Sequence, residues 1–245
     1  MKLWEKLSAR NQNAGACAPV LLAFIDDSVT HGCFEVYMDH RGEIGIVYEP
    51  DEGYPYRLKR RLDQLYPAAA VSVLNAGVSG ESSVDGARRL ERDVLSKSPD
   101  LVVIAFALND SMNPDVESGL RSYREAMTDM ILRTQARGAE CIVLTPNHMC
   151  RYVSAHVKDA QLREIAEQAA RVQNAGVLER YVQAAREVAA QCGVPVADAY
   201  RLWDRMDRCG VDTTSLLSNH INHPTREGHE LFVQALLDVL LESSD

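Results

Sequence analysis

The sequence predicts an α/β protein, in which a three-layer α/β/α sandwich is built on a five-stranded parallel sheet. Five short, almost continuously apolar segments alternate with longer segments whose apolar residues recur at spacings of three and four. Strands that are covered on both faces have this continuous apolar character, and such alternation is typical of parallel strands joined by right-handed crossovers. The chain has 245 residues, of which 46% are apolar, and this length suits a single domain over residues 1–245.

The apolar segments are the predicted strands, and they span residues 20–26, 71–76, 101–107, 141–145 and 194–197. The segments between them are rich in Ala, Arg and Glu, and they predict helices over residues 56–66, 83–96, 116–137 and within 160–191. A last helix is expected over residues 226–241, with Thr225 as its N-cap and Glu227 in its first turn.

Residues 33–55 fit neither pattern, because they hold three glycines and four aromatic residues among charged ones. We expect an inserted loop or hairpin over the carboxyl ends of the strands. A solvent-exposed loop without a functional role would explain the composition equally well.

Composition excludes several classes of partner. Lys and Arg number 26 and Asp and Glu 35, so the formal net charge is −9, which disfavours binding to nucleic acid or to anionic membrane surfaces. The first long apolar run, residues 16–25, is too short to span a bilayer.

The six cysteines include no C-x-x-C pair, so we expect reduced thiols and a cytoplasmic protein. The sequence leaves a homo-oligomer open.

Four polar residues or glycines stand at positions where the predicted fold places its ligand-binding edge. Ser28 follows the first strand, Gly80 the second and Asn109 the third, and His223 precedes the last helix. Ligands of parallel sheets bind at the carboxyl ends of the strands. A serine there is a candidate nucleophile, a histidine a candidate base, and N–H groups are candidate donors to an oxyanion.

These residues lie in four segments, 24–28, 75–80, 107–110 and 223–229, which together resemble the motifs of the GDSL-type (SGNH) hydrolases. The resemblance implies a flavodoxin-like sheet of the SGNH hydrolase type and a serine esterase or lipase-like acylhydrolase without a cofactor. It assigns the nucleophile to Ser28 and the base to His223. It assigns the oxyanion hole to the N–H of Ser28, the N–H of Gly80 and the side-chain amide of Asn109.

The match departs from the family pattern at three positions. Asp26 and Ala107 stand where glycines are usual, and His220 stands where the family commonly places an Asp three residues before the histidine. Because an acid normally fixes the tautomer of the base, another group must orient His223. The candidates are a backbone carbonyl of the 219–222 turn, Asp212 or Asp26, whereas His220 is expected at the surface or in packing.

Two other interpretations remain. Asp26 and Asp27 together resemble the acidic pair that binds Mg²⁺ in phosphotransfer domains of similar architecture. A hydrolase fold that only binds a sugar or an acyl group is the other. The spacing of His220, His223 and His229 does not fit a zinc helix, so no metal is expected, and His229 is predicted to be buried and bonded to backbone. For an esterase, small acetyl esters, including those of carbohydrates, are the expected substrates.

Overall fold

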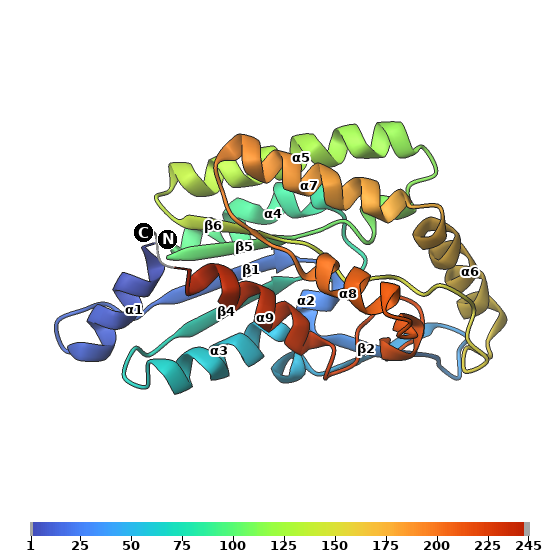
Figure 1. Cartoon of the computed structure of the whole chain (residues 1–245), viewed down its shortest axis with the longest axis horizontal. Coiled ribbons are helices and arrows are strands. Elements are labelled where there is room, and N and C mark those ends of the chain that lie inside the picture. The colour runs from blue at the N-terminus through green and yellow to red at the C-terminus, as the bar shows by residue number, and fades with distance from the viewer. Residues whose placement is uncertain (1, 243–245) are drawn as a thin grey trace.

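The computed structural model describes residues 2–242 and contains a five-stranded parallel sheet (Figure 1). Its strands are β1 (Leu21–Asp26), β4 (Ser72–Gly77), β5 (Leu101–Ala105), β6 (Glu140–Leu144) and β7 (Val196–Ala197). They pair in the order β4-β1-β5-β6-β7. Numbered among the parallel strands alone, this is the flavodoxin-like order 2-1-3-4-5. The predicted α/β fold and its sheet are therefore confirmed.

Helices cover both faces of the sheet. They are α1 (Leu3–Gln12), α2 (Ser28–His31), α3 (Tyr54–Leu65), α4 (Ser83–Asp93), α5 (Val116–Ala136), α6 (Ala160–Asn174), α7 (Val177–Cys192), α8 (Ala199–Arg208) and α9 (His229–Leu240). Short 3₁₀ turns follow at Pro50–Glu52, Leu95–Lys97, Asp110–Met112 and Thr213–Leu216. Figure 1 shows α4, α5 and α7 on one side of the sheet and α3 and α9 on the other. None of the helices within residues 2–242 has the length and apolar character needed to cross a membrane.

Three of the predicted helices differ from the observed ones. The helix predicted over 83–96 ends at Asp93, and a separate 3₁₀ turn spans Leu95–Lys97. The stretch 160–191 is broken at Gly176, whose φ of +70° ends α6 and starts α7. The last helix begins at His229, three residues later than predicted. Thr225 instead closes a turn before it, because its hydroxyl accepts a hydrogen bond from the N–H of Gly228 over 3.1 Å. Helices α1, α2 and α8 were not predicted.

The segment predicted as a loop or hairpin contains a hairpin. Strands β2 (Cys33–Met38) and β3 (Ile44–Tyr48) pair in antiparallel fashion, and the register of the pair shifts between Cys33 and Val36. Such an irregularity leaves backbone groups of one strand without partners in the ladder. The hairpin lies beside α2, at the carboxyl end of β1.

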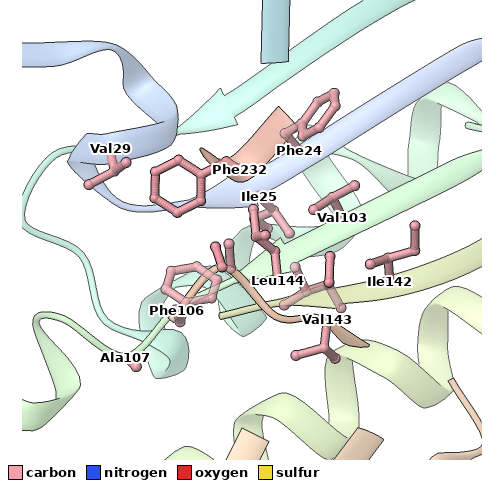
Figure 2. Packing of buried hydrophobic residues seen from close by; sticks show 14 of the residues in the cluster. Phe24, Ile25, Val29, Val103, Phe106, Ala107, Ile142, Val143, Leu144 and Phe232 are labelled. Carbon is pink, nitrogen blue, oxygen red and sulfur yellow. The ribbon is translucent and has the colours of Figure 1, made fainter. Parts of the chain in front are cut away.

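Buried apolar side chains join the sheet to its helices. Figure 2 shows Ile25 of β1, Val103 of β5 and Ile142 of β6 among them, with Phe232 of α9 nearby. The connection that leaves β1 runs to β4 on one side, while β5 lies on the other side. The carboxyl end of β1 is therefore the switch point of the sheet, where open α/β folds form their binding crevice.

Candidate active site

The end of β1 positions Ser28. The chain turns directly from Asp26 into α2, and the side chain of Asp27 caps this helix by accepting a hydrogen bond from the N–H of Val29 over 3.0 Å. The helix ends after one turn at Gly32, whose φ of +92° suits glycine alone. The strand end and the cap together hold Ser28 at the carboxyl edge of the sheet.

Ser28 meets His223, which lies 195 residues further along the chain. The distance between Ser28 Oγ and His223 Nε2 is 3.0 Å, and each residue is only 5% exposed. The turn before α9 places the imidazole of His223 next to Ser28. The side-chain oxygen of Asn219 accepts hydrogen bonds from the backbone N–H groups of Ile221, Asn222 and His223, at 2.9, 2.9 and 3.0 Å. This triple contact fixes the backbone of the turn.

The other imidazole nitrogen of His223 contacts the hairpin. Nδ1 lies 2.9 Å from the backbone carbonyl oxygen of Phe34. Because a carbonyl oxygen only accepts hydrogen bonds, Nδ1 carries the proton and Nε2 is left as the acceptor that faces the Ser28 hydroxyl. This is the tautomer that a base acting on Ser28 requires.

The carbonyl that orients His223 is not one of those expected from the 219–222 turn. In that turn, the carbonyl of Ile221 accepts from the N–H of Cys150 over 2.7 Å, and the carbonyl of Asn222 accepts from the side chain of Asn147 over 2.8 Å. With these oxygens bonded elsewhere, the acceptor comes from the hairpin, 189 residues earlier in the chain.

The two acids considered for this role are also engaged elsewhere. Asp212 accepts hydrogen bonds from the hydroxyl of Tyr152 over 2.6 Å and from a backbone N–H of its own turn. Asp26 accepts from the hydroxyl of Thr30 over 2.7 Å. Within residues 2–242 neither carboxylate bonds to the imidazole of His223, so both expectations are corrected.

His220, at the position where the family commonly has an acid, faces another partner. Its ring stacks on that of His156, with centroids 4.9 Å apart and an angle of 16° between the planes. Its φ of +55° is left-handed, a conformation that His adopts more readily than most residues. His220 therefore packs against a side chain, as expected.

Asn109 bonds to chain neighbours of both Ser28 and Gly80. The side-chain amide of Asn109 donates to the carbonyl of Glu81 over 2.9 Å and contacts the carboxylate of Asp27 over 3.3 Å. Asn109 thus joins the residue before Ser28 to the residue after Gly80. Gly80 has a φ of +83°, and no atom lies within 4 Å of the point where a Cβ would stand. The glycine is needed here for its backbone conformation and not for space.

Burial sets the charge of the imidazole. It lowers the pKa of His223 to about 4, although the nearby carboxylate of Glu35 acts in the opposite direction. The imidazole is therefore neutral near pH 7 and can accept a proton. The ring of His229 is also fully buried, and its Nδ1 accepts a hydrogen bond from the backbone N–H of Tyr54 over 3.1 Å, as predicted.

Three buried carboxyl groups lie beneath the site. Burial raises the pKa of Asp27 to about 7 and that of Asp110 to about 6, and it raises the pKa of Asp26 well above its usual range. All three accept hydrogen bonds from the protein, Asp110 from the N–H and the hydroxyl of Ser83. In the described part of the chain, no group of three or more His, Cys, Asp or Glu side chains is placed to hold a metal ion. The Mg²⁺ interpretation of Asp26 and Asp27 is therefore not favoured.

The role of Phe34 could not be predicted from the sequence. Its contribution is a backbone carbonyl, which every residue has, so the residue type carries no signal. The irregular register of β2 leaves this carbonyl outside the ladder, and that register depends on how the two strands pair.

The fold and the Ser28–His223 pair at its switch point place the protein among the hydrolases with a three-layer α/β/α fold. The profile of the GDSL-like Lipase/Acylhydrolase family matches residues 27–231. The chain belongs to this family, and it is an ester hydrolase of the GDSL (SGNH) type.

Individual relatives agree with this assignment. An acetylxylan esterase of Geobacillus stearothermophilus is 25% identical over 223 residues, which cover 88% of this chain and 91% of the relative. The esterase TesA of Pseudomonas aeruginosa is 30% identical over 109 residues, 43% of this chain and 45% of the relative.

Solved structures share the fold. An alpha/beta hydrolase enzyme from the metagenome of Lake Arreo superposes with a TM-score of 0.67 at 23% identity, covering 92% of this chain and 98% of the other. The crystal structure of an acetylxylan esterase from Geobacillus stearothermophilus gives a TM-score of 0.67 at 20% identity, covering 91% and 95%.

Proposed function

We propose that the protein is a serine esterase that removes short acyl groups, above all acetyl groups, from small or carbohydrate-like substrates through an acyl-enzyme. The observation that carries this proposal is the 3.0 Å contact between Ser28 Oγ and His223 Nε2, with the opposite nitrogen held by a carbonyl. The similarity to an acetylxylan esterase over 88% of the chain supports the class of substrate.

In the proposed reaction, Ser28 Oγ attacks the ester carbonyl carbon while its proton passes to His223 Nε2. The tetrahedral intermediate expels the alcohol, which takes that proton from the imidazolium, and the acyl group remains on Ser28 as an ester. A water molecule then gives its proton to His223 Nε2 and attacks this ester. Collapse of the second intermediate returns the proton to Ser28 and releases the carboxylic acid.

The oxyanion of both intermediates needs donors at the same edge of the sheet. We assign them to the N–H groups of Ser28 and Gly80 and the side-chain amide of Asn109. Of the two hydrogen bonds that the Asn109 amide makes, the 3.3 Å contact with Asp27 is the longer, so we infer that the substrate oxygen replaces this one. Removal of one such donor typically costs about 2.7–4 kcal/mol of barrier.

The test uses p-nitrophenyl esters of increasing acyl length beside acetylated xylo-oligosaccharides. We expect the acetyl ester to have the highest kcat/KM. S28A and H223A should each lower kcat by at least about 10⁴-fold, because the loss of either member of a catalytic unit removes most of the effect of the whole unit. The matched control is S154A, which removes another buried serine hydroxyl and leaves the rate unchanged. If S28A or H223A hydrolysed esters at the wild-type rate, the assignment of roles would be wrong.

A fluorophosphonate probe separates this proposal from a fold that only binds acyl groups or sugars. The active esterase is labelled at Ser28, and EDTA leaves both labelling and turnover unchanged. A protein that resists the probe while binding acetylated oligosaccharides would instead be a binding protein.

A further inference from the structure

Arg226, three residues after His223, ties the histidine segment to both strands of the hairpin. Its Nη1 and Nη2 donate to the two carboxylate oxygens of Glu35 in β2 over 2.6 and 3.1 Å. Its Nε donates to the carboxylate of Glu49, which follows β3, over 2.8 Å. A planar guanidinium makes such a two-pronged contact in a fixed geometry, whereas the ammonium group of Lys acts as a point charge.

The same guanidinium covers the residue that supplies the carbonyl. The Cζ of Arg226 lies 4.4 Å from the centroid of the Phe34 ring, and the ring of His229 contacts Phe34 with centroids 5.1 Å apart. Phe34 is fully buried and lies where the hairpin register is irregular. Its side chain and the residue after it are therefore both held by Arg226, while its carbonyl is free to accept from His223.

We propose that Arg226 is a positioning residue: through Glu35 and the Phe34 ring, it holds the Phe34 carbonyl against His223 Nδ1. This carbonyl takes the place of the acid that the family commonly has at the position of His220. The proposal rests on the esterase function proposed above. In a triad, the acid both orients the imidazole and offsets the charge of the imidazolium. Here the Phe34 carbonyl orients the imidazole, and the carboxylate of Glu35 contributes to offsetting its charge.

The charges around the imidazole fit this division. Glu35 from β2 and Glu49 from the end of β3 face one guanidinium, so this cluster has a net negative charge of one. The carboxylate of Glu35 raises the pKa of His223 against the larger effect of burial. The His229 ring, which contacts Phe34, adds no charge near neutral pH, because burial lowers its own pKa to about 3.

A second arginine offers a matched control. Arg57 on α3 also bridges two glutamates, Glu52 after the hairpin and Glu230 on α9, and its Nη1 lies 2.8 Å from Glu230 Oε1. It is more buried than Arg226, with side-chain exposures of 16% and 29%. The ion pairs of Arg57 do not involve the segments of Phe34 and His223. R57Q therefore shows the effect of removing a similar ion-pair cluster that does not hold the catalytic histidine.

The experiment compares R226Q, R226K and R57Q by steady-state kinetics and by the ¹⁵N spectrum of histidine-labelled full-length protein, with the His223 signals assigned by their loss in H223A. In R226Q we expect kcat to fall roughly 10- to 100-fold with KM within about twofold, since misplacement of a catalytic group costs on this order. The Nδ1–H form of His223 should lose population to the Nε2–H form. The kcat of R226K should lie between those of the wild type and R226Q, because an ammonium group keeps the positive charge but cannot make the two-pronged contact with Glu35.

R57Q is the control variant, and two results for R226Q would contradict the proposal. R57Q should keep the wild-type kcat and the wild-type tautomer, whatever its melting temperature. A wild-type kcat with an unchanged His223 tautomer in R226Q overturns the proposal, as does a fall in kcat with an unchanged tautomer. If R226Q does not fold, R226K decides by the same two measurements.

This test separates the proposal from the esterase function. The tautomer is measured without substrate, so it reports on Arg226 even if no ester is hydrolysed. A wild-type protein that is inert to all esters and to fluorophosphonate rejects the proposed function. An active protein with a dead S28A variant and an unaffected R226Q variant rejects only the role of Arg226.

Discussion

The two ends of the Ser28–His223 hydrogen bond are held in different ways. Ser28 is placed by residues next to it in the chain: β1 ends two residues before it, and the cap of α2 is the adjacent Asp27. A strand end followed by a capped helix turn is local structure, and it depends little on distant segments.

His223 depends on contacts between distant segments. Its Nδ1 is held by Phe34 in the hairpin, and the carbonyl before it, that of Asn222, is held by the side chain of Asn147 after β6. Local contacts act on its backbone as well: Asn219 accepts from its N–H, and the N–H and hydroxyl of Ser218 donate to its carbonyl. Activity is therefore most easily lost on the histidine side, where a change can misplace the base while the sheet stays intact.

Among changes that leave Ser28 and His223 themselves in place, N219A should have the largest effect on activity. The variant leaves the N–H groups of Ile221, Asn222 and His223 without their shared acceptor in a turn where Asn219 itself is 7% exposed. We expect a loss of about 2 kcal/mol in the free energy of unfolding, because buried donors without acceptors are costly. The kcat for p-nitrophenyl acetate should fall at least about 100-fold, since the imidazole moves away from Ser28.

Two controls sharpen this result. N219D keeps an acceptor oxygen for the three N–H groups and should recover most of the activity. D159A removes a comparable side-chain cap at α6, where Asp159 accepts from the N–H groups of Gln161 and Leu162. It should cost about 1 kcal/mol of stability and leave kcat unchanged. Wild-type turnover in N219A would show that the local turn does not position His223.

The same contrast explains what could be predicted from sequence. Strand positions, the flavodoxin-like order and the neighbourhood of Ser28 follow from apolar runs and short motifs, which act over a few residues. The partner of His223 Nδ1 could not be found this way, because it is a backbone oxygen exposed by an irregular strand pair 189 residues away. Residue type alone points to acids such as Asp212 and Asp26, whose carboxylates bond elsewhere. That the chain forms one domain stays a prediction.

The pH dependence of activity should report on the histidine side. Since burial lowers the pKa of His223 to about 4, its neutral form predominates above that pH and is lost below it. We expect kcat/KM to fall about tenfold per pH unit below about 4, as the imidazole becomes protonated. The measurement is kcat/KM for p-nitrophenyl acetate from pH 3 to 7.

Acid unfolding could produce a similar fall and has to be separated from it. Burial also lowers the pKa of His148 to about 4, so the unfolded chain binds this proton more readily and stability decreases as the pH falls from about 6.5 toward 4. H148N removes the contribution of His148 to this pH dependence of stability. If protonation of His223 causes the fall in kcat/KM, the pH of the fall should be the same in H148N as in the wild type. If unfolding causes it, the fall should shift to another pH in H148N. Far-UV circular dichroism at each pH provides the second check.

The smallest effect is expected on the serine side, at Ala107. Its φ is +147° in a residue that is 1% exposed, at a position where the family usually has glycine. An alanine in this conformation is strained, so A107G should raise the free energy of unfolding by about 1 kcal/mol while kcat changes by less than about threefold. A105G, two residues earlier in β5, should have the opposite sign, because glycine weakens a regular strand by about 0.5–1 kcal/mol. If both variants were destabilised equally, Ala107 would carry no strain. A stabilised A107G with a large loss of kcat would mean that strain here helps to place Asn109, and the serine side would then depend on more than its local chain.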